Sequence, residues 1–366
     1  MKNAENPWPM EKHELTGSFE QDSRFALGVW TLVIVLFIVS VLAAGIGAVS
    51  LSSGEVLSIM ARYLGLTHAP PYWPPSDDVI LLQIRLPRVL GAALVGAALS
   101  VAGTLFQGLL RNPMADPFVI GTSGGAALGA TLGVLLASRI TVLGFGAVPA
   151  LAFLGALGTM ALVYRLSRIG DRTAVVTLLL AGFALSVILS YAMSLILILN
   201  DRLQLNTRVV YAWLLGGITV TRWSQVSIIA LLVLGGIAVS FAFGRSLNAL
   251  SLGDETAQQL GVSVERYRAA IIATGSILTA AAVSAGGMIG FVGLIVPHFL
   301  RLNFGPNHRH LLPLSALGGA SFLVFADLVS RVAIRPTELP VGILTAFIGG
   351  PAFLFLLRQT KREYRF

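Results

Sequence analysis

The sequence predicts an all-α protein that crosses a membrane about ten times. Of its 366 residues, 55% are hydrophobic and only 11% are charged, and the mean hydropathy is +0.83. A soluble fold needs more charged residues to cover its surface. A helix that crosses a hydrocarbon core of ~30 Å needs about 20 apolar residues. Ten segments approach that length: residues 25–49, 89–109, 118–137, 144–164, 174–199, 225–243, 268–287, 289–303, 311–330 and 341–357.

The first and the eighth of these segments need separate justification. Residues 25–49 are too long for the core of a signal peptide and follow 24 mostly polar residues, so we expect an uncleaved span. Residues 289–303 are short and contain Pro297, but only an even number of spans places both basic termini on one side. That side then holds most of the Lys and Arg residues, including all the lysines, as the cytoplasmic side should. We therefore predict ten spans with both termini in the cytoplasm.

This topology divides the chain into a cytoplasmic tail (1–24), a transmembrane domain (25–357) with a cytoplasmic insert (245–268), and a second cytoplasmic tail (358–366). The net charge of +8 is assigned to cytoplasmic loops that face anionic lipid rather than to a nucleic-acid site. The sequence contains no cysteine, which excludes disulfides, thiolate metal sites and cysteine nucleophiles.

The acidic residues argue against a transporter driven by an ion gradient. Of the 17 Asp and Glu residues, only Asp327 lies within an apolar segment. Proton- and sodium-driven transporters usually carry acidic groups at mid-membrane depth. Asp327 is one helical turn from Arg331, and we interpret it as the partner of that arginine, with a role as a proton relay left open. A secondary transporter remains the alternative function.

Catalytic motifs are absent from the sequence. None of the five histidines has the His-Glu-x-x-His spacing of a metalloprotease, and four of them lie in tails or loops. We expect no catalytic residue, no metal ligand and no bound cofactor. The sequence also lacks the G-x-x-x-x-G-K-[ST] phosphate loop, so transport driven by ATP would need a separate ATPase.

The cytoplasmic insert offers a surface for such a partner. Asp254 and Glu255 follow Gly253 and place negative charge at the start of a short helix, which suits the helix dipole, and Gly261 suits its end. A helix that lies on lipid carries Lys or Arg along its polar face, whereas residues 252–262 contain two acids and no base. We therefore expect a protein partner here. The apolar residues are predicted to share one patch: Leu252, Ala257 and Leu260.

Several blocks of sequence, in order, resemble the permease subunits of type II ABC importers, the FecCD and BtuC-like family. They include "SLGDETAQQLGV" (251–262), "GFVGLIVPHFLRL" (290–302) and "RPTELPVGILTAFIGGPAFLFLLR" (335–358). The resemblance implies a homodimer in the bacterial cytoplasmic membrane. Such a dimer binds two copies of a cytoplasmic ABC ATPase and receives cargo from an external substrate-binding protein. It also implies that residues 252–261 contact the ATPase, and that the cargo is a ferric siderophore, haem or cobalamin. The motifs are common to all three, and we favour an iron chelate on family abundance alone.

The segment "RNPMADPFVIGTSGG" (111–125) interrupts two apolar spans. Pro113 and Pro117 break the helix, and Asp116 suits the N-cap of the next helix with Pro117 in its first position. The resemblance implies that this turn forms part of a cytoplasmic gate lined by Asn112 and Met114.

Three arginines lie at the predicted outer ends of spans, against the positive-inside bias: Arg85, Arg88 and Arg331. Taken singly, each could be an anchor whose side chain extends to the membrane surface. The resemblance implies instead that they receive carboxylates from the two lobes of the binding protein, as bidentate pairs. Arg335 and Glu338 are further candidates at the rim.

Overall fold

The structure is a computed structural model that describes residues 10–47, 49–68, 70–136, 141–142, 145–170, 172–200, 207–334 and 336–363. Within these ranges the chain is almost entirely helical. The β-structure of the described residues consists of two short antiparallel pairs and one isolated bridge, between Ile334 and Thr337. The pairs are β1 (Thr141–Val142) with β2 (Phe145–Gly146), and β3 (Arg168–Ile169) with β4 (Arg172–Thr173). The predicted all-α class is confirmed.

Eight helical segments of the described residues are long and apolar enough to cross a membrane. They are Ser23–Gly45 of α1 (Met10–Gly45); Pro75–Leu109, formed by α3 (Pro75–Val79), η1 (Ile80–Arg85) and α4 (Leu86–Leu109); α6 (Ala147–Ser167); α7 (Val175–Leu199); α10 (Trp223–Ala242); α13 (Val264–Gly286); α15 (His308–Val332); and Val341–Arg358 of α16 (Val341–Glu363). Two shorter apolar helices, α5 (Thr122–Leu136) and α14 (Val292–Phe304), fall on the predicted third and eighth spans. Each of the ten predicted segments therefore corresponds to an apolar helix.

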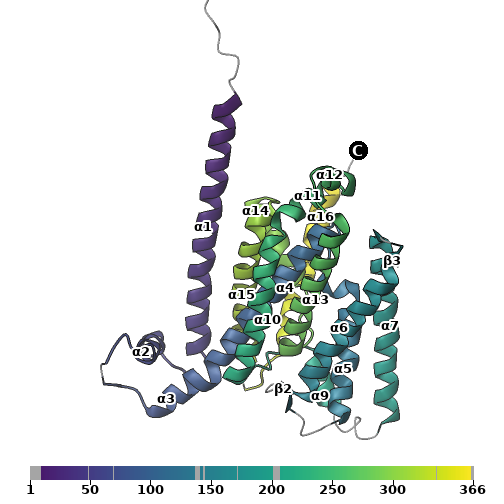
Figure 1. The fold of residues 1–366 in the computed structure, drawn as a ribbon. Helices are drawn as coiled ribbons and strands as arrows, with labels where there is room; N and C mark the ends of the chain where they lie inside the picture. The colour runs from purple at the N-terminus through teal and green to yellow at the C-terminus, as the bar shows by residue number, and fades with distance from the viewer. Residues whose placement is uncertain are drawn as a thin grey trace, which may run out of the picture.

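The remaining short elements are α2 (Ser53–Tyr63), η2 (Pro117–Ile120), α9 (Thr207–Leu214), α11 (Gly244–Ser251) and α12 (Asp254–Gln259). Of these, η2 packs within the bundle against α4, α5, α7 and α13, and the others lie toward its two ends. Figure 1 shows α11, α12 and the last turns of α16 at one end, which we call the α12 end. The elements α2, α3, α9 and β2 lie toward the other, which we call the α2 end. Helix α1 enters from the α12 end.

Helix α4 forms the centre of the bundle and is the most completely buried of the long helices. Small residues let its neighbours approach closely: a Cβ at Gly103 would lie 1.8 Å from the Gly293 carbonyl oxygen of α14. Gly96 and Gly319 make a similar contact between α4 and α15. Gln107 of α4 then donates from Nε2 to the Gly293 carbonyl oxygen at 3.2 Å. In a membrane, where lipid is as apolar as Leu, such close packing and interhelical hydrogen bonds hold helices together.

Candidate functional site

The insert forms α11 and α12 at the α12 end. Gly253 (φ 116°) and Gly261 (φ 82°) have the positive φ that glycine tolerates, and they bound α12 on either side, as predicted. The predicted apolar patch is wrong in one member. Leu252 and Leu260 are 65% and 62% exposed, but Ala257 is completely buried and belongs to the main hydrophobic core. The six-residue helix α12 packs one face against the bundle, and Ala257 lies on that face.

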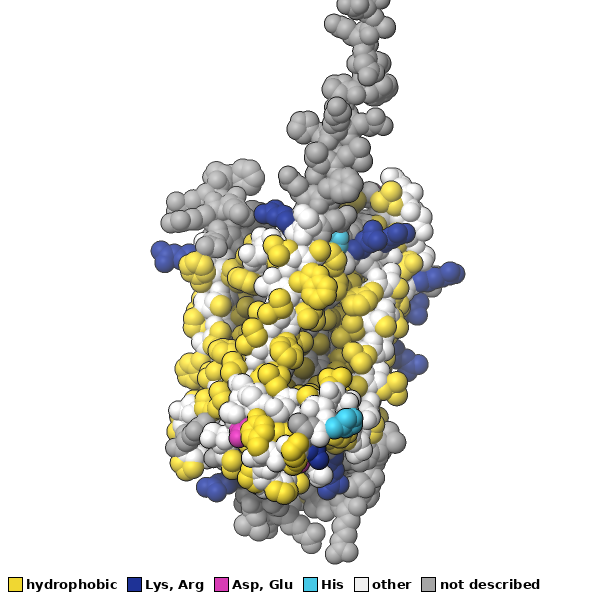
Figure 2. All heavy atoms as spheres, turned by 90° about the vertical axis from the view of Figure 1, so that its left-hand side faces the viewer, with side chains coloured by type: hydrophobic (Ala, Val, Ile, Leu, Met, Phe, Trp, Pro, Cys, Tyr) yellow, Lys and Arg dark blue, Asp and Glu magenta, His cyan; other side chains and the backbone are white. Residues whose placement is uncertain are grey.

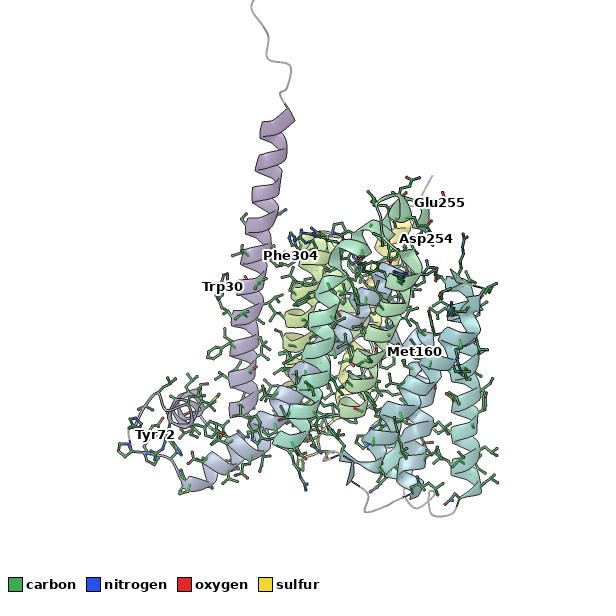
Figure 3. The ribbon with its side chains drawn as sticks, viewed as in Figure 1. Trp30, Tyr72, Met160, Asp254, Glu255 and Phe304 are labelled. Atoms are coloured by element: carbon green, nitrogen blue, oxygen red, sulfur yellow. The ribbon has the colours of Figure 1, made fainter. Side chains whose placement is uncertain are left out.

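The two acids of α12 lie in different surroundings (Figure 3). The Asp254 carboxylate forms ion pairs with Arg111, from the turn after α4, and with Arg268 of α13, at 2.8 Å from Nη2. Glu255 is exposed and has no ion pair among the residues that the structure describes. Asp254 therefore joins α12 to its own chain, whereas Glu255 is available to a partner.

The ion pairs of Asp254 extend to the β3–β4 hairpin. Arg268 also pairs with Glu265, one turn before it in α13. Glu265 Oε2 accepts a hydrogen bond from the Thr173 backbone N–H at 3.0 Å, and Arg268 Nη1 donates to the Thr173 carbonyl oxygen at 3.3 Å. We call these four side chains, Arg111, Asp254, Glu265 and Arg268, the α12-end network.

The network holds Asp254 in its charged form. Partial burial acts to raise the pKa of Asp254, but the hydrogen bond and charge of Arg268, followed by those of Arg111, outweigh it, so the pKa lies below its ordinary value. Arg111 is itself held by a second contact, because its Nε donates to the Leu250 carbonyl oxygen of α11 at 2.8 Å. Its φ of 49° is unusual for a residue other than glycine.

The turn that follows Arg111 has the predicted break in the helix. Asn112 is exposed, and its Oδ1 accepts a hydrogen bond from the Met114 N–H at 2.9 Å, so the side chain stabilises the turn. Asp116 is an N-cap and Pro117 holds the first position, as predicted. The element that they begin is the short 3₁₀ helix η2, however, and α5 starts only at Thr122.

Asp116 differs from Asp254 in having no ion pair among the described residues. Its Oδ1 accepts a hydrogen bond from the Phe118 N–H at 2.8 Å. Burial raises the pKa of Asp116 to about 6, although that hydrogen bond acts to lower it. A cavity of about 350 Å³ lies beside Asp116, between η2, α5, α7 and residues 290–291.

The three arginines predicted at outer helix ends lie together at the α2 end, but they contact other parts of the chain. Arg88 forms ion pairs with Asp327 of α15 at 3.1 Å and with Glu338 at 2.9 Å. Arg331 pairs with the same Asp327 at 3.0 Å, as the sequence spacing predicted. Arg85 donates from Nη1 to the carbonyl oxygens of Ala44 and Gly45, at 2.6 and 2.7 Å.

Two of the three arginine side chains are therefore buried among residues of their own chain. Arg85 is 7% exposed, and the Arg331 side chain 6%. A buried guanidinium needs partners close at hand, and the end of α1 supplies carbonyl oxygens while α15 supplies a carboxylate. The Arg88 side chain is 25% exposed, and Glu338 is half exposed. Arg335 lies outside the described residues. We call Arg88, Asp327, Arg331 and Glu338 the α2-end network.

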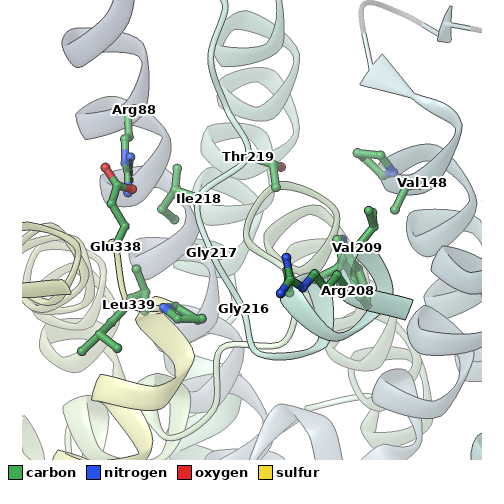
Figure 4. A pocket seen from close by; sticks show the side chains of 15 residues that line it. Arg88, Val148, Arg208, Val209, Gly216, Gly217, Ile218, Thr219, Glu338 and Leu339 are labelled. Atoms are coloured by element: carbon green, nitrogen blue, oxygen red, sulfur yellow. Dashed lines mark hydrogen bonds and ion pairs between the residues drawn. The ribbon is translucent and has the colours of Figure 1, made fainter. Parts of the chain in front are cut away.

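A cavity of about 670 Å³ opens beside this network (Figure 4). Arg88 and Glu338 line one part of it, and Arg208 and Trp213 of α9 line another. The Trp213 indole N–H is buried and has no hydrogen-bond partner among the described residues. Helix α9 was not among the elements predicted from the sequence. The sequence feature that could have pointed to a functional element here is the stretch 200–224. It carries arginines on the predicted outer side, against the usual bias.

Comparison with known proteins identifies relatives along almost the whole chain. The profile of the FecCD transport family matches residues 32–359. The cobalamin import system permease of Halobacterium salinarum is 46% identical over 292 residues, which cover 80% of this chain and 76% of that protein. The hemin transport system permease of Yersinia pestis is 38% identical over 340 residues, which cover 91% and 95% of the two chains. A solved structure described as a metal-chelate type ABC transporter, inward-facing, has 32% identity and a TM-score of 0.76, and covers 90% of this chain and 98% of its own.

Proposed function

Because the chain belongs to the FecCD transport family, we propose that it carries a metal chelate across the cytoplasmic membrane with energy from ATP hydrolysed by a partner. It is a multi-pass membrane protein and the permease of a metal-chelate or vitamin type ABC importer. Permease subunits are transport components, so the chain is not an enzyme. In this proposal the α12 end faces the cytoplasm, with both termini, and the α2 end faces outward.

The α12-end network is the observation that carries this proposal. Residues 252–261 are the surface offered to the ATPase, through the exposed Leu252, Glu255 and Leu260. Asp254 ties this helix through Arg111 to the turn that carries Asn112 and Met114. A displacement of α12 by the ATPase would therefore pull on that turn directly. We infer that Asn112 and Met114 close the cytoplasmic gate, since Asn112 is exposed and Met114 has a flexible apolar side chain.

The network also ties α12 to the β3–β4 hairpin, through Arg268 and Glu265. That hairpin leads into α7, which remains largely uncovered in a single chain. Phe183 and Tyr191 of α7 are 67% and 73% exposed. We propose that two copies of the chain form a homodimer with α7 and α16 around the transport pathway, and that α12 moves both the turn and the start of α7.

The cavity at the α2 end supplies the outer part of this pathway. A volume of about 670 Å³ per chain suits one half of a bulky chelate. Arg208 offers hydrogen-bond donors to anionic groups, while Val148 and Pro149 offer apolar contact. The cargo that we propose is a ferric siderophore, haem or cobalamin, and the cavity does not distinguish among them. Relatives of this chain are named for cobalamin and for hemin.

Docking of a substrate-binding protein is proposed at the same end. Arg88 is the most accessible of the three arginines, and an incoming carboxylate would compete with Glu338 for its Nη1. Arg85 and Arg331 would act behind it, by holding the ends of α1, α4 and α15 in place.

The test is uptake by proteoliposomes that contain the permease, its ATPase and its binding protein. We expect accumulation of chelate only with internal ATP and with all three components. An Asp254→Asn variant should keep the complex but lose uptake per ATP hydrolysed. Uptake driven by an ion gradient, without any ATPase, would instead support the secondary transporter and overturn the proposal.

A further inference from the structure

The segment between α1 and α4 has no part in the proposed transport cycle. It runs from Leu51 through α2 to α3, and we call it the α2–α3 segment (residues 51–79). Figure 1 shows that it projects sideways past α1, away from α7 and the cavity at the α2 end. Helix α2 is seen end-on beside the lower end of α1, so its axis lies across the membrane-spanning direction.

The segment has a defined conformation, held by a capping box and by a buried apolar face. A capping box begins α2: Ser52 Oγ accepts from the Glu55 N–H at 3.2 Å, and Glu55 accepts from the Ser52 N–H at 2.7 Å. Val56 and Ile59 are buried against α1 and η1, together with Trp73. The Trp73 indole N–H donates to Asp78 at 2.8 Å. This inner face therefore fixes how α2 lies on α1.

Beside this buried face, the segment carries exposed apolar side chains. Leu57 of α2 and Leu64, the C-cap residue of that helix, lie seven residues apart on one side of it and are 44% and 63% exposed. Beyond the helix, Leu66 is 76% exposed and Tyr72 is 68% exposed. Tyr63, at the last position of α2, is 69% exposed. Large apolar side chains grouped in this way mark a surface that another phase or molecule covers.

The position of this surface identifies what covers it. It continues the outward face of α1, where Trp30, Ile34 and Phe37 are 66%, 55% and 59% exposed in a membrane-spanning helix. Figure 2 shows hydrophobic side chains over the span and onto the projecting segment below it. In Figure 1, α2 also lies nearer the middle of the bundle than the lower ends of α6 and α7. A protein docked on the cavity at the α2 end would approach from below and not from this side.

We propose that the α2–α3 segment is an interfacial membrane anchor that lies in the lipid leaflet at the α2 end. Leu57, Leu64 and Leu66 enter the acyl region, and Tyr63 and Tyr72 lie at the headgroups, where amphipathic rings concentrate. Asp77 and Asp78, in α3, remain on the water side. The anchor braces α1 against α4, because Arg85, just after this segment, holds the carbonyl oxygens of Ala44 and Gly45.

The absence of cysteine from the chain allows a direct test with single-cysteine variants. A nitroxide label is attached to Leu57→Cys, Leu64→Cys and Leu66→Cys in the assembled transporter in proteoliposomes. Ile34→Cys, on the exposed side of α1, is the lipid reference, and Ser76→Cys, exposed on α3, is the water reference. The measurement is the ratio of collision rates with oxygen, which enriches in lipid, and with a water-soluble nickel chelate.

Labels at Leu64 and Leu66 should give ratios within about 2-fold of Ile34 and at least about 5-fold above Ser76, because they lie below the headgroups. Ratios equal to that of Ser76 would overturn the proposal. The same labels are then measured with the binding protein added. Nickel access that is high at first and falls only with that protein would make the segment a docking surface for protein, and would likewise overturn the lipid assignment. ATP-driven uptake tests the proposed transport function independently of either result.

Discussion

The two ends of the bundle each hold a network of arginines and carboxylates, but the two networks differ in burial and in the elements that they join. The α2-end network joins the ends of long helices, and its central Asp327 is 1% exposed. The α12-end network joins short elements at the surface, and its central Asp254 is 42% exposed. Charges paired away from water hold elements rigidly, because separating them leaves a charge without solvent. Charges paired near water can separate and re-form at small cost. The α2-end network therefore suits helices that keep fixed relative positions, and the α12-end network suits elements that move relative to one another.

The largest effect is expected from breaking the buried network. Asp327→Asn leaves Arg88 and Arg331 without their shared carboxylate, and should lower the free energy of unfolding by about 3–5 kcal/mol. Glu338→Gln is the matched control, because Glu338 is half exposed and its removal should cost less than about 1 kcal/mol. Thermal unfolding in detergent measures both. Equal melting temperatures for the two variants would contradict the assignment of Asp327 as the centre of a rigid frame.

Asp116 is a partly buried carboxylate that has no arginine partner among the residues the structure describes. Its pKa of about 6 lies above the unfolded value of 3.8, so the folded state binds the proton more tightly. The free energy of unfolding should therefore rise as the pH falls from about 6 to about 4, and the charged carboxylate should cost at most about 3 kcal/mol above that window. Asp116→Asn keeps an acceptor for the Phe118 N–H without the charge.

Chemical denaturation at several pH values tests this expectation. The Asn variant should be more stable than the parent protein at pH 7.5, and the difference should shrink toward pH 4. A constant difference across that range would mean that Asp116 does not titrate there.

The third prediction separates the two acids of α12. Asp254→Asn should reduce transport per ATP hydrolysed with the ATPase still bound, because it cuts the connection to Arg111 and Arg268. Glu255→Lys should weaken ATPase binding by up to about fivefold, because an exposed contact is worth ~1 kcal/mol, without a change in permease stability. Titration of the ATPase against nanodisc-reconstituted permease, with parallel uptake assays, distinguishes them. The distinction fails if both variants weaken binding equally.

The smallest effect is expected at the exposed edge of the α2-end network. Arg88→Lys should slow association of the binding protein by about 2- to 5-fold with an unchanged salt dependence, because lysine keeps the charge but lacks the planar fork. Arg331→Lys is the control, since the Arg331 side chain is buried and should not meet the partner. Association rates at low and high salt provide the comparison. Identical rates for the parent protein and Arg88→Lys would remove Arg88 from the docking surface.

The sequence by itself determined those features that depend on neighbours along the chain. The ten apolar segments follow from the length needed to cross a bilayer, and each corresponds to a helix. Gly253 and Gly261 bound α12, and Asp116 with Pro117 begins η2, because caps act within a few residues. The pairing of Asp327 with Arg331 was also accessible, since one turn of helix brings them together.

Only the tertiary structure decided which charges meet across the bundle. Arg88 and Asp327 are 239 positions apart, and Arg111 and Asp254 are 143 apart, so no local periodicity relates them. For this reason the sequence analysis gave Arg85, Arg88 and Arg331 one shared docking role, and gave Asp254 and Glu255 one shared role in ATPase contact. Ala257 was misplaced for the same reason, since the face that a short helix buries is chosen by its neighbours. Spans and caps are local properties of a chain, whereas the partner of a charge is set by the packing of distant helices.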